Sequence, residues 1–358
     1  MTVPSPSFWR GKRVLLTGHT GFKGSWLATW LLDMGAEVHG LALPPETQPN
    51  LHEILVLPYT SQTICDLRDA EAVSNAVKQI NPQIVLHLAA QALVRRSYKD
   101  PVESIATNVL GTAHLLQSLR GCDTLDAILV VTSDKAYDNP AYAPGHTHPP
   151  FKEGDPLGGR DPYSASKGAQ EIITRSFAQS FFKEANIPVV TARAGNVIGG
   201  GDWSNDRLMT DVIAASANGQ PVILRNPHAT RPWQHVLDPL AGYLTYVEYT
   251  CARTTDAPAL NFGPDGAHTV AEVVDEFASC WPGSLGWARP ESATPVSDKA
   301  EASVLALDPS LARQTINWQP RLSFANSIEW VATWHQAHLA GDDMATTTRD
   351  QITRFQDL

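Results

Sequence analysis

The chain has only four cysteines in 358 residues, and no two of them form a CxxC pair. Scattered cysteines without metal-ligand spacing argue against a zinc site and a disulfide framework, and they indicate reduced, packed thiols. The chain also lacks any run near the ~18 consecutive apolar residues of a membrane span, and its first residues lack the apolar core of a signal peptide. We therefore predict a cytoplasmic protein with no membrane partner and no bound metal.

Basic residues are outnumbered by acidic ones. The sequence has 27 Lys and Arg against 37 Asp and Glu, which gives a formal net charge of -10. This balance predicts that nucleic acid is not a partner, because its phosphate backbone is bound by clustered Lys and Arg. A small phosphorylated ligand stays compatible, provided that one pocket gathers Arg, Lys and backbone N–H groups. Internal repeats and low-complexity tracts are also absent, as expected for an ordinary globular enzyme or binding protein.

The first half of the chain has a regular alternation of strand and helix patterns. Near-continuous apolar strands separated by helices are typical of a parallel sheet that is covered on both faces. The pattern predicts an α/β fold with a Rossmann-like doubly wound parallel sheet and a smaller mixed α/β domain. The predicted strands are 13–17, 37–43, 84–88, 128–131 and 189–192, and the predicted helices between them include 25–34, 70–80 and 102–119.

The alternation breaks after about residue 194, where glycine, proline and tryptophan become frequent. Two later stretches, around 236–250 and 259–262, again have the patterns of the first half. We predict a dinucleotide-binding domain from 8–193 plus about 236–264, and a substrate-binding domain from about 194–235 plus 265–340. Residues 341–358 are predicted to be a polar C-terminal tail with weak helical character.

A glycine-rich turn follows the first predicted strand and precedes a helix, with GxxGxxG spacing. Glycines let the backbone approach a pyrophosphate, and the helix N-terminus supplies N–H groups and the positive end of its dipole. In this context the motif predicts a dinucleotide site rather than a structural turn. The residues expected at the cofactor are Gly18, Thr20, Gly21, Phe22, Lys23 and Gly24.

The second predicted strand lacks the terminal acid that usually holds the adenosine 2′-hydroxyl. Its end, at 42–46, has neither a clean Asp nor an Arg for a 2′-phosphate, so the sequence favours NAD over NADP and predicts loose retention of the cofactor. Glu46 is a weak substitute, and its alternative interpretation is a solvated loop acid. Asp66 is a candidate contact for the adenine, with helix N-capping as an equal alternative.

Acid–base groups follow a strand and open a later helix. Ser133 and Asp134 directly follow the strand at 128–131. Asp161 and Pro162 resemble a helix start, which places Tyr163 and Lys167 one above the other on the same helix face. A nearby ammonium favours tyrosinate, so the phenol can act as a general base while the lysine holds a nicotinamide ribose. The alternative for Asp134 is a strand-end cap or a loop ion pair.

Together these residues resemble the extended short-chain dehydrogenase/reductases and, among them, the nucleotide-sugar 4,6-dehydratases of the CDP-glucose branch. The resemblance covers about residues 8–335. The last two of its segments and Lys135, which follows Asp134, indicate the CDP-glucose branch. The segments that carry it are 16–24, 87–91, 107–112, 132–135, 158–167, 195–203 and 231–237.

The resemblance implies an NAD-dependent lyase that converts CDP-D-glucose to CDP-4-keto-6-deoxy-D-glucose, and a homodimer. Tyr163 would take the C4 hydroxyl proton as C4 loses a hydride to NAD⁺, and Asp134 would protonate the hydroxyl that leaves C6 before the hydride returns there. Ser133 would hydrogen-bond the C4 oxygen, and Lys167 would orient the ribose. Two alternatives stay open: another nucleotide-sugar 4,6-dehydratase or 4-epimerase (GDP-mannose, dTDP-glucose or UDP-glucose), and a non-catalytic NAD-sensing protein.

Lys135 departs from the pattern of the other dehydratases, which carry Glu after the Asp as the base for C5. A lysine side chain is ordinarily cationic near neutral pH and is then a poor base. Two hypotheses compete: Lys135 is a desolvated base, or it stabilises the enolate while another group takes the proton.

The resemblance also implies contacts beyond these groups. Arg suits a substrate pyrophosphate because its planar fork donates two parallel hydrogen bonds. Further cofactor contacts are expected at Leu67, Leu88, Ala89, Ala90 and Asn108, and substrate contacts at Gln91, Asn196, Arg207, Arg231 and Trp203. Several of these have structural alternatives: a helix-interior contact for Asn108, core packing for Trp203 and Trp233, an ion pair for Arg193, and structural roles for His87 and His235.

Overall fold

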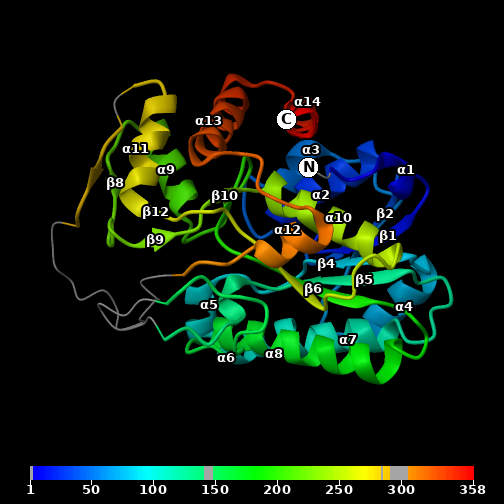
Figure 1. The fold of residues 1–358 in the computed structure, drawn as a ribbon. Helices are drawn as coiled ribbons and strands as arrows, with labels where there is room; N and C mark the ends of the chain where they lie inside the picture. Colours follow the sequence, from blue (N-terminus) through cyan, green and yellow to red (C-terminus); the bar gives the residue numbers. More distant parts are fainter. Residues whose placement is uncertain (1–2, 141–147, 284, 291–304) are drawn as a thin grey trace.

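The computed structural model describes residues 3–140, 148–283, 285–290 and 305–358 (Figure 1). At its centre is a parallel sheet of seven strands in the order β11-β6-β5-β4-β1-β2-β3. This order is that of a doubly wound Rossmann sheet with one further strand, which confirms the predicted fold class. The strands are β1 (Arg13–Thr17), β2 (Glu37–Ala42), β3 (Ser61–Ile64), β4 (Ile84–His87), β5 (Ala127–Val131), β6 (Val189–Ala194) and β11 (Ala259–Phe262).

Strand residues alternate between two apolar cores, one on each face of the sheet. Along β1, Val14 and Leu16 pack into one core while Leu15 packs into the other. Both faces are therefore buried, which explains why these strands have near-continuous apolar sequences.

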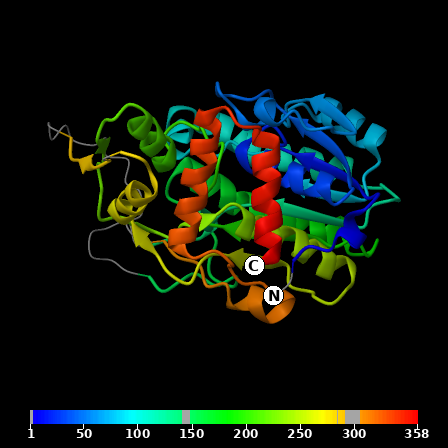
Figure 2. The same ribbon diagram turned by 90° about the horizontal axis from the view of Figure 1, so that it is seen from above.

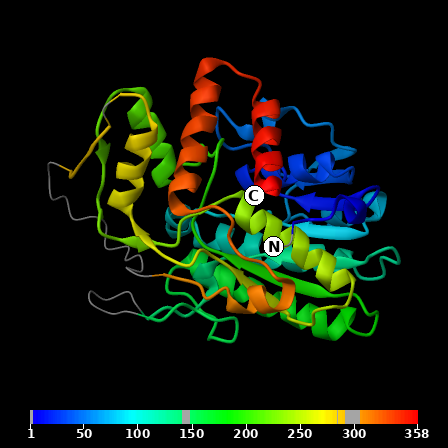
Figure 3. The same ribbon diagram turned by 45° about the horizontal axis from the view of Figure 1, so that its top comes forward.

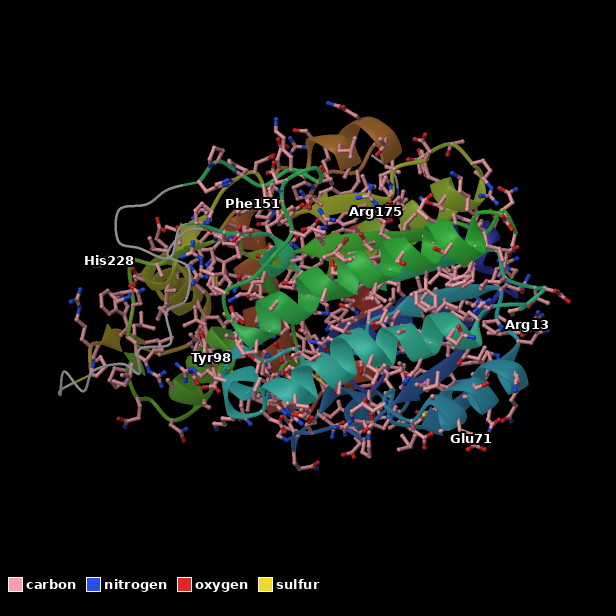
Figure 4. All side chains as sticks on the ribbon, turned by 90° about the horizontal axis from the view of Figure 1, so that it is seen from below. Arg13, Glu71, Tyr98, Phe151, Arg175 and His228 are labelled. Carbon is pink, nitrogen blue, oxygen red and sulfur yellow. The ribbon has the colours of Figure 1, made fainter. Side chains whose placement is uncertain are left out.

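Helices cover both faces (Figure 1). The face shared with Val14 is covered by α2 (Phe22–Asp33), α10 (Leu237–Cys251), α12 (Ser310–Ile316) and α14 (Met344–Asp357). The other face is covered by α4 (Ala70–Ile80), α7 (Gly111–Ser118) and α8 (Pro162–Phe177), which lie side by side when the molecule is seen from below (Figure 4). The remaining helices of this part are α1 (Pro6–Trp9), α3 (Leu51–Leu55), α5 (Val94–Lys99), α6 (Pro101–Ile105), η1 (Ala106–Leu110), η2 (Asp134–Ala136) and η3 (Ala178–Phe182).

A smaller lobe lies beside the carboxyl edge of the sheet (Figure 3). It has a core of its own, to which α9 (Leu208–Ala217), α11 (Val270–Cys280) and α13 (Phe324–Ala340) contribute. Its strands form three short pairs. They are β7 (Val197–Ile198) with β10 (Gln234–His235), β9 (Thr230–Arg231) with β12 (His268–Thr269), and β8 (Val222–Ile223) with β13 (Trp287–Ala288).

The C-terminal residues, predicted as a tail, form the helix α14, which packs beside α13 and over α2 (Figure 2). The sequence from 344 to 357 is polar, but Ile352 and Phe355 are buried, and Phe355 meets Trp30 edge to face with ring centroids 5.7 Å apart. Arg321 donates hydrogen bonds to the carbonyls of Phe355 and Gln356 at the end of the helix. Two apolar anchors and this capping arginine stabilise a helix that its own propensity barely predicts.

Other elements differ from the predictions in position. β3 is a polar edge strand with half-exposed residues, so it has no apolar run by which to be found. The helix predicted over 102–119 consists of α6, the π-helix η1 and α7, and α2 starts at Phe22 rather than at residue 25. Among the described residues, no helix is long and apolar enough to cross a membrane.

Candidate active site

The carboxyl ends of β1, β4 and β5 meet at one edge of the sheet, because these three strands are neighbours. The glycine-rich loop follows β1, Leu88 to Gln91 follow β4, and Ser133 and Asp134 follow β5. Ligands of open α/β sheets bind at this edge, where the order of strands reverses.

The glycine-rich loop is packed too tightly for larger residues. Gly18 has φ +78°, and a Cβ on it would lie 2.8 Å from the backbone nitrogen of Ala89. A Cβ on Gly24 would lie 2.0 Å from the carbonyl oxygen of Gly18. The helix α2 starts after Gly21 without a side-chain cap, so the N–H groups of its first turn have no side-chain acceptor among the described residues. These features fit the pyrophosphate of a dinucleotide.

The polar groups near the ends of β2 and β3 are bonded to other parts of the chain. Thr20 donates a hydrogen bond to the carbonyl of Leu43 at 2.8 Å. Glu46 pairs with Arg96 at 2.6 Å and is mostly exposed, in agreement with a solvated loop acid. Both carboxylate oxygens of Asp66 accept hydrogen bonds from Arg68. The N-cap of α4 is Asp69, so the capping role considered for Asp66 is wrong.

Ser133 and Asp134 form a compact hydrogen-bonded turn at the end of β5. The Ser133 hydroxyl caps η2 by accepting the N–H of Lys135 at 3.1 Å, and it donates to Oδ1 of Asp134 at 2.9 Å. Oδ2 of Asp134 is buried and has no hydrogen-bond partner in the described part of the chain. Burial raises the pKa of Asp134, against the opposing effects of Lys135, Ser133 and Arg231. The carboxyl group is therefore biased toward its protonated form.

Helix α8 brings Tyr163 and Lys167 to this turn. Asp161 caps the helix by accepting the N–H of Ser164 at 2.9 Å, as the sequence predicts, and Pro162 lies in the first turn. Burial raises the pKa of Tyr163, and a hydrogen-bonding interaction with Ser133, rather than Lys167, has the largest lowering effect. Lys167 donates to Oε1 of Gln170 at 2.9 Å and to the Val131 carbonyl at 3.5 Å.

The amines of half-buried Lys23 and buried Lys167 influence each other in the site. Burial and the nearby Lys23 lower the pKa of Lys167 to about 7, while Glu171 opposes the shift. Burial and Arg207 lower the pKa of Lys23 to about 8, against Asp134 and Asp202. From the sequence, Lys23 is only a residue of the glycine-rich loop. Its electrostatic effect on Lys167, and that of Asp134 on Lys23, are known only from the structure.

Asn108 ties three elements together within the π-helix η1. Its amide oxygen accepts the N–H of Gln91 at 2.8 Å, and its amide nitrogen donates to the Gln91 carbonyl at 3.0 Å and to Oγ of Ser166 at 2.9 Å. Asn108 therefore connects the loop after β4 to α8. A π-helical turn is often found at a functional site, where it re-aims a side chain.

The predicted substrate contacts come from both the sheet edge and the smaller lobe, and so are spread more widely than the acid–base groups. Arg231 and Arg207 approach from the smaller lobe, since Arg231 lowers the pKa of Asp134 and Arg207 that of Tyr163. Gln91 uses its side chain to bond Ser104 and the N–H of Leu93. The carbonyl of Asn196 accepts the N–H of Gln234. Trp203 packs against the rings of Trp334, His335 and His338 on α13.

Four residues for which the sequence left a structural role open are held by ion pairs, hydrogen bonds or core packing. Arg193 forms a buried ion pair with Glu171 at 2.7 Å. His87 is buried between Thr17 and Thr112, and His235 is buried beside Trp26 and Trp330. Trp233 lies in the core of the smaller lobe. Across the residues that the structure describes, no group of three His, Cys, Asp or Glu side chains is arranged to hold a metal ion.

Comparison with known proteins gives a consistent family. The family model of GDP-mannose 4,6 dehydratase matches residues 15–331. The CDP-glucose 4,6-dehydratase of Salmonella typhimurium is 42% identical over 98% of this chain and 97% of its own length.

Solved structures agree on the fold. An epimerase from Methanothermobacter thermautotrophicus superposes with a TM-score of 0.79 at 24% identity, covering 94% of this chain and 95% of its own. The UDP-glucose 4-epimerase of Thermus thermophilus, in complex with NAD, superposes with a TM-score of 0.70 at 26% identity, covering 89% and 97%.

Proposed function

The chain belongs to the GDP-mannose 4,6 dehydratase family, and from that premise we propose that it is an NAD-dependent CDP-glucose 4,6-dehydratase. The proposed reaction is the conversion of CDP-D-glucose to CDP-4-keto-6-deoxy-D-glucose. The nucleotide follows the 42% identical Salmonella enzyme, and the cofactor follows the related epimerase that binds NAD.

One observation carries the choice of an elimination over a simple oxidation or an epimerisation. Asp134 is a buried acid with a raised pKa, hydrogen-bonded to the hydroxyl that also interacts with Tyr163. A 4-epimerase needs no acid for the C6 oxygen. An acid whose pKa is raised by burial, placed beside the base for C4, suits the departure of water from C6.

In this mechanism each group of the chain has one task. Tyr163 takes the proton of the C4 hydroxyl, and Ser133 hydrogen-bonds the C4 oxygen. Lys167 would hold the nicotinamide ribose, and the first turn of α2 together with Leu88, Ala89 and Ala90 would hold the rest of the cofactor. Asp134 protonates the hydroxyl that leaves C6. When bound, NAD would supply the hydride chemistry at C4 and C6.

The substrate would lie between the sheet edge and the smaller lobe. We assign Arg207 and Arg231 to its pyrophosphate, because both affect the charge state of the catalytic groups and a guanidinium suits phosphate. Asn196 and Gln91 are proposed nearby, and Trp203 would support this region through α13. The predicted division into a cofactor domain and a substrate domain is part of the same proposal.

The direct test is incubation of the purified protein with NAD and CDP-D-glucose, followed by detection of the 4-keto sugar through its absorbance in alkali. dTDP-glucose, GDP-mannose and UDP-glucose serve as competitors. We expect product with CDP-glucose and at least tenfold less with the others. Product from another nucleotide sugar alone would overturn the CDP assignment and keep the chemistry, and a 4-epimer without 4-keto product would overturn the elimination.

Lys135 is proposed to act on C5, either as a base or by stabilising the enolate. It is half-buried and lies close enough to Asp134 to lower the pKa of that acid. A Lys135→Met variant separates the two roles through exchange of deuterium from solvent into C5. Loss of exchange identifies Lys135 as the base, whereas retained exchange with a lower rate identifies electrostatic stabilisation.

A homodimer is proposed through the outer face of α6, η1 and α8 (Figure 4). Large apolar side chains are exposed on these helices and on η3, which continues α8: Val102, Ile105, Leu110, Ile172 and Phe181. Such a cluster is expected at an interface between copies. The double substitution Ile105→Glu with Ile172→Glu should yield a monomer by light scattering. The matched control is Val56→Glu on another surface, where Val56 is 81% exposed.

The absence of an acid at the end of β2 supports loose retention of NAD. The Leu43 carbonyl and the Thr20 hydroxyl are bonded to each other at that edge. We expect the purified protein to lose most of its NAD on dialysis; full occupancy afterwards would contradict this. A cytoplasmic location is proposed with the function, since nucleotide sugars and NAD are substrates of that compartment.

A further inference from the structure

The proposed reaction ends with one proton on a different residue from the one that needs it for the next turnover. Over a cycle the hydride leaves C4 and returns to C6, so oxidation and reduction cancel. The proton removed from C5 is replaced at C5. The sugar loses water, made of the C6 hydroxyl and a proton from Asp134, while Tyr163 keeps the proton of the C4 hydroxyl. Each turnover therefore ends with Tyr163 protonated and Asp134 deprotonated.

The structure contains a short path between these two groups. Oγ of Ser133 lies 2.9 Å from Oδ1 of Asp134. Helix α8 packs against η2, and the Ser133 hydroxyl lowers the pKa of Tyr163 through a hydrogen-bonding interaction. All three side chains are buried, with at most 8% of each residue exposed, so exchange with bulk water around the path is hindered.

The hydrogen bonds of Ser133 also fix a direction. A serine hydroxyl has one proton to donate and two lone pairs that accept. When Asp134 is a carboxylate, the Ser133 proton points to Oδ1, and one lone pair is occupied by the N–H of Lys135 at 3.1 Å. The remaining lone pair is left to accept a proton from the phenol of Tyr163, so the order is Tyr163 O–H to Ser133 O–H to Asp134.

We infer that Ser133 is a proton relay, which passes a proton from Tyr163 to Asp134 after each turnover. The Tyr163 O–H bond breaks as a new O–H bond forms on Ser133, and the original Ser133 O–H bond breaks as one forms on Oδ1 of Asp134. Charge passes from the carboxylate to the phenolate, which is the state needed to accept the next C4 proton. With sugar bound, the C4 oxygen takes the place between the two hydroxyls, so the relay works once product has left. This role rests on the proposed dehydratase function.

The test is a rapid-quench time course with CDP-glucose and saturating NAD, using the isosteric pair Ser133→Thr and Ser133→Val. Threonine keeps a hydroxyl, and valine has the same shape without one. We expect Ser133→Val to form about one product per site and then to slow by roughly 100-fold, the range of a lost acid–base step. Ser133→Thr should keep the steady rate within about tenfold of the natural chain. Added formic acid should speed the slow phase of the valine variant only.

A linear time course for Ser133→Val, with first and later turnovers equally slowed, would overturn the relay and leave only the hydrogen bond to the C4 oxygen. Loss of the η2 cap is controlled by the thermal unfolding of both variants. If Ser133→Val does not fold, the solvent isotope effect of the natural chain decides: two protons in flight give a curved dependence of the steady rate on deuterium fraction, and a straight line overturns the relay. Absence of product from the natural chain would instead reject the dehydratase function.

Discussion

Two carboxylates lie buried beside β5, and they differ in how completely their oxygens are bonded. Glu171 accepts four hydrogen bonds: Oε1 from Thr132 and Arg193, and Oε2 from Thr191 and Arg193. Asp134 accepts the Ser133 hydroxyl at Oδ1 and interacts with the backbone N–H of Lys135, whereas its Oδ2 has no partner within the described chain. Both groups are almost inaccessible, at 4% and 3% exposed.

The difference separates a structural acid from a reactive one. Four donors, two of them from a guanidinium, satisfy both carboxylate oxygens of Glu171 and fasten α8 to β6. Asp134 lacks this compensation, so burial raises its pKa and favours the proton that the proposed reaction needs. Both acids are buried, so the proposed catalytic role of Asp134 depends on its incomplete bonding beside Tyr163 and Ser133 rather than on burial alone.

Asp134→Asn breaks the reactive side of the comparison and has the largest expected effect. An amide has a similar shape and cannot donate the proton to the C6 oxygen. We expect the rate of 4-keto-6-deoxy product formation to fall by about 10³-fold. Oxidation at C4 should persist and appear as the absorbance of reduced cofactor. Asp123→Asn, at an exposed acid far from the site, is the control. A loss below tenfold would show that another group is the acid.

Glu171→Gln tests the structural side. The amide leaves the Arg193 guanidinium buried without a counter-charge, and such a loss costs about 3–5 kcal/mol of unfolding free energy. Urea unfolding measures this cost, and activity per folded molecule should stay within about threefold of the natural chain. Adding Arg193→Met should recover part of the stability. A stable variant with a 100-fold lower rate would instead place Glu171 in the catalytic machinery.

Asp238 is a third buried acid that, like Asp134, has one carboxylate oxygen without a partner in the described chain. It bonds the segment before α13 instead of the turn after β5. Its Oδ1 accepts the N–H of Arg321 at 2.6 Å, its Oδ2 has no partner among the residues described, and burial raises its pKa to about 7. The folded state thus binds the proton more tightly than the unfolded chain, and this acid lowers stability progressively as the pH rises from about 4 to about 7.

Asp238→Asn should remove that penalty. The stability gain over the natural chain, from urea unfolding, should be near zero at pH 4 and reach a few kcal/mol at pH 8, in the direction set by linkage. Product formation should stay within twofold, because this carboxyl group bonds the segment before α13 rather than the catalytic turn. A gain that does not depend on pH would mean that Asp238 is protonated or ionised throughout. A large loss of activity in Asp238→Asn would show that Asp238 also contributes to the reaction, which would contradict the distinction drawn between it and Asp134.

The sequence predicts those parts of the site that depend on short-range patterns. β1, β4 and β5 are apolar throughout because both of their faces are buried, so their ends, and with them Ser133 and Asp134, can be located. Asp161 and Pro162 locate the start of α8, and the helical repeat then places Tyr163 and Lys167 on one face.

The missed features depend on contacts between distant segments. Glu171 continues the spacing of Tyr163 and Lys167 along α8, but its meaning comes from Arg193 on β6. The raised pKa of Asp134 and the lowered pKa of Lys23 follow from burial, which no local pattern encodes. The edge strand β3 and the helix α14 are polar segments, ordered by the sheet and by a few buried anchors.

The same comparison between bonded and unbonded buried groups can be made with the hydroxyls of two tyrosines on α10. Their substitutions have the smallest expected effects. Both are fully buried three residues apart. The Tyr246 hydroxyl donates to the Ala257 carbonyl, whereas the Tyr243 hydroxyl has no partner in the part of the chain that the structure describes. Tyr243→Phe should raise the unfolding free energy by up to about 1 kcal/mol by removing an unsatisfied group, and Tyr246→Phe should lower it by about 1 kcal/mol.

The location of Tyr243 makes the activity of its variant informative. Burial raises the pKa of Tyr243, with further contributions from Asp134 and Tyr163, and the Lys23 ammonium nitrogen lies 6.0 Å from the centroid of its ring. If the hydroxyl has no task, Tyr243→Phe keeps the rate within threefold as its stability rises. A stabilised variant that is at least tenfold slower would place Tyr243 with Asp134, as a buried polar group left unsatisfied by the fold because the reaction uses it.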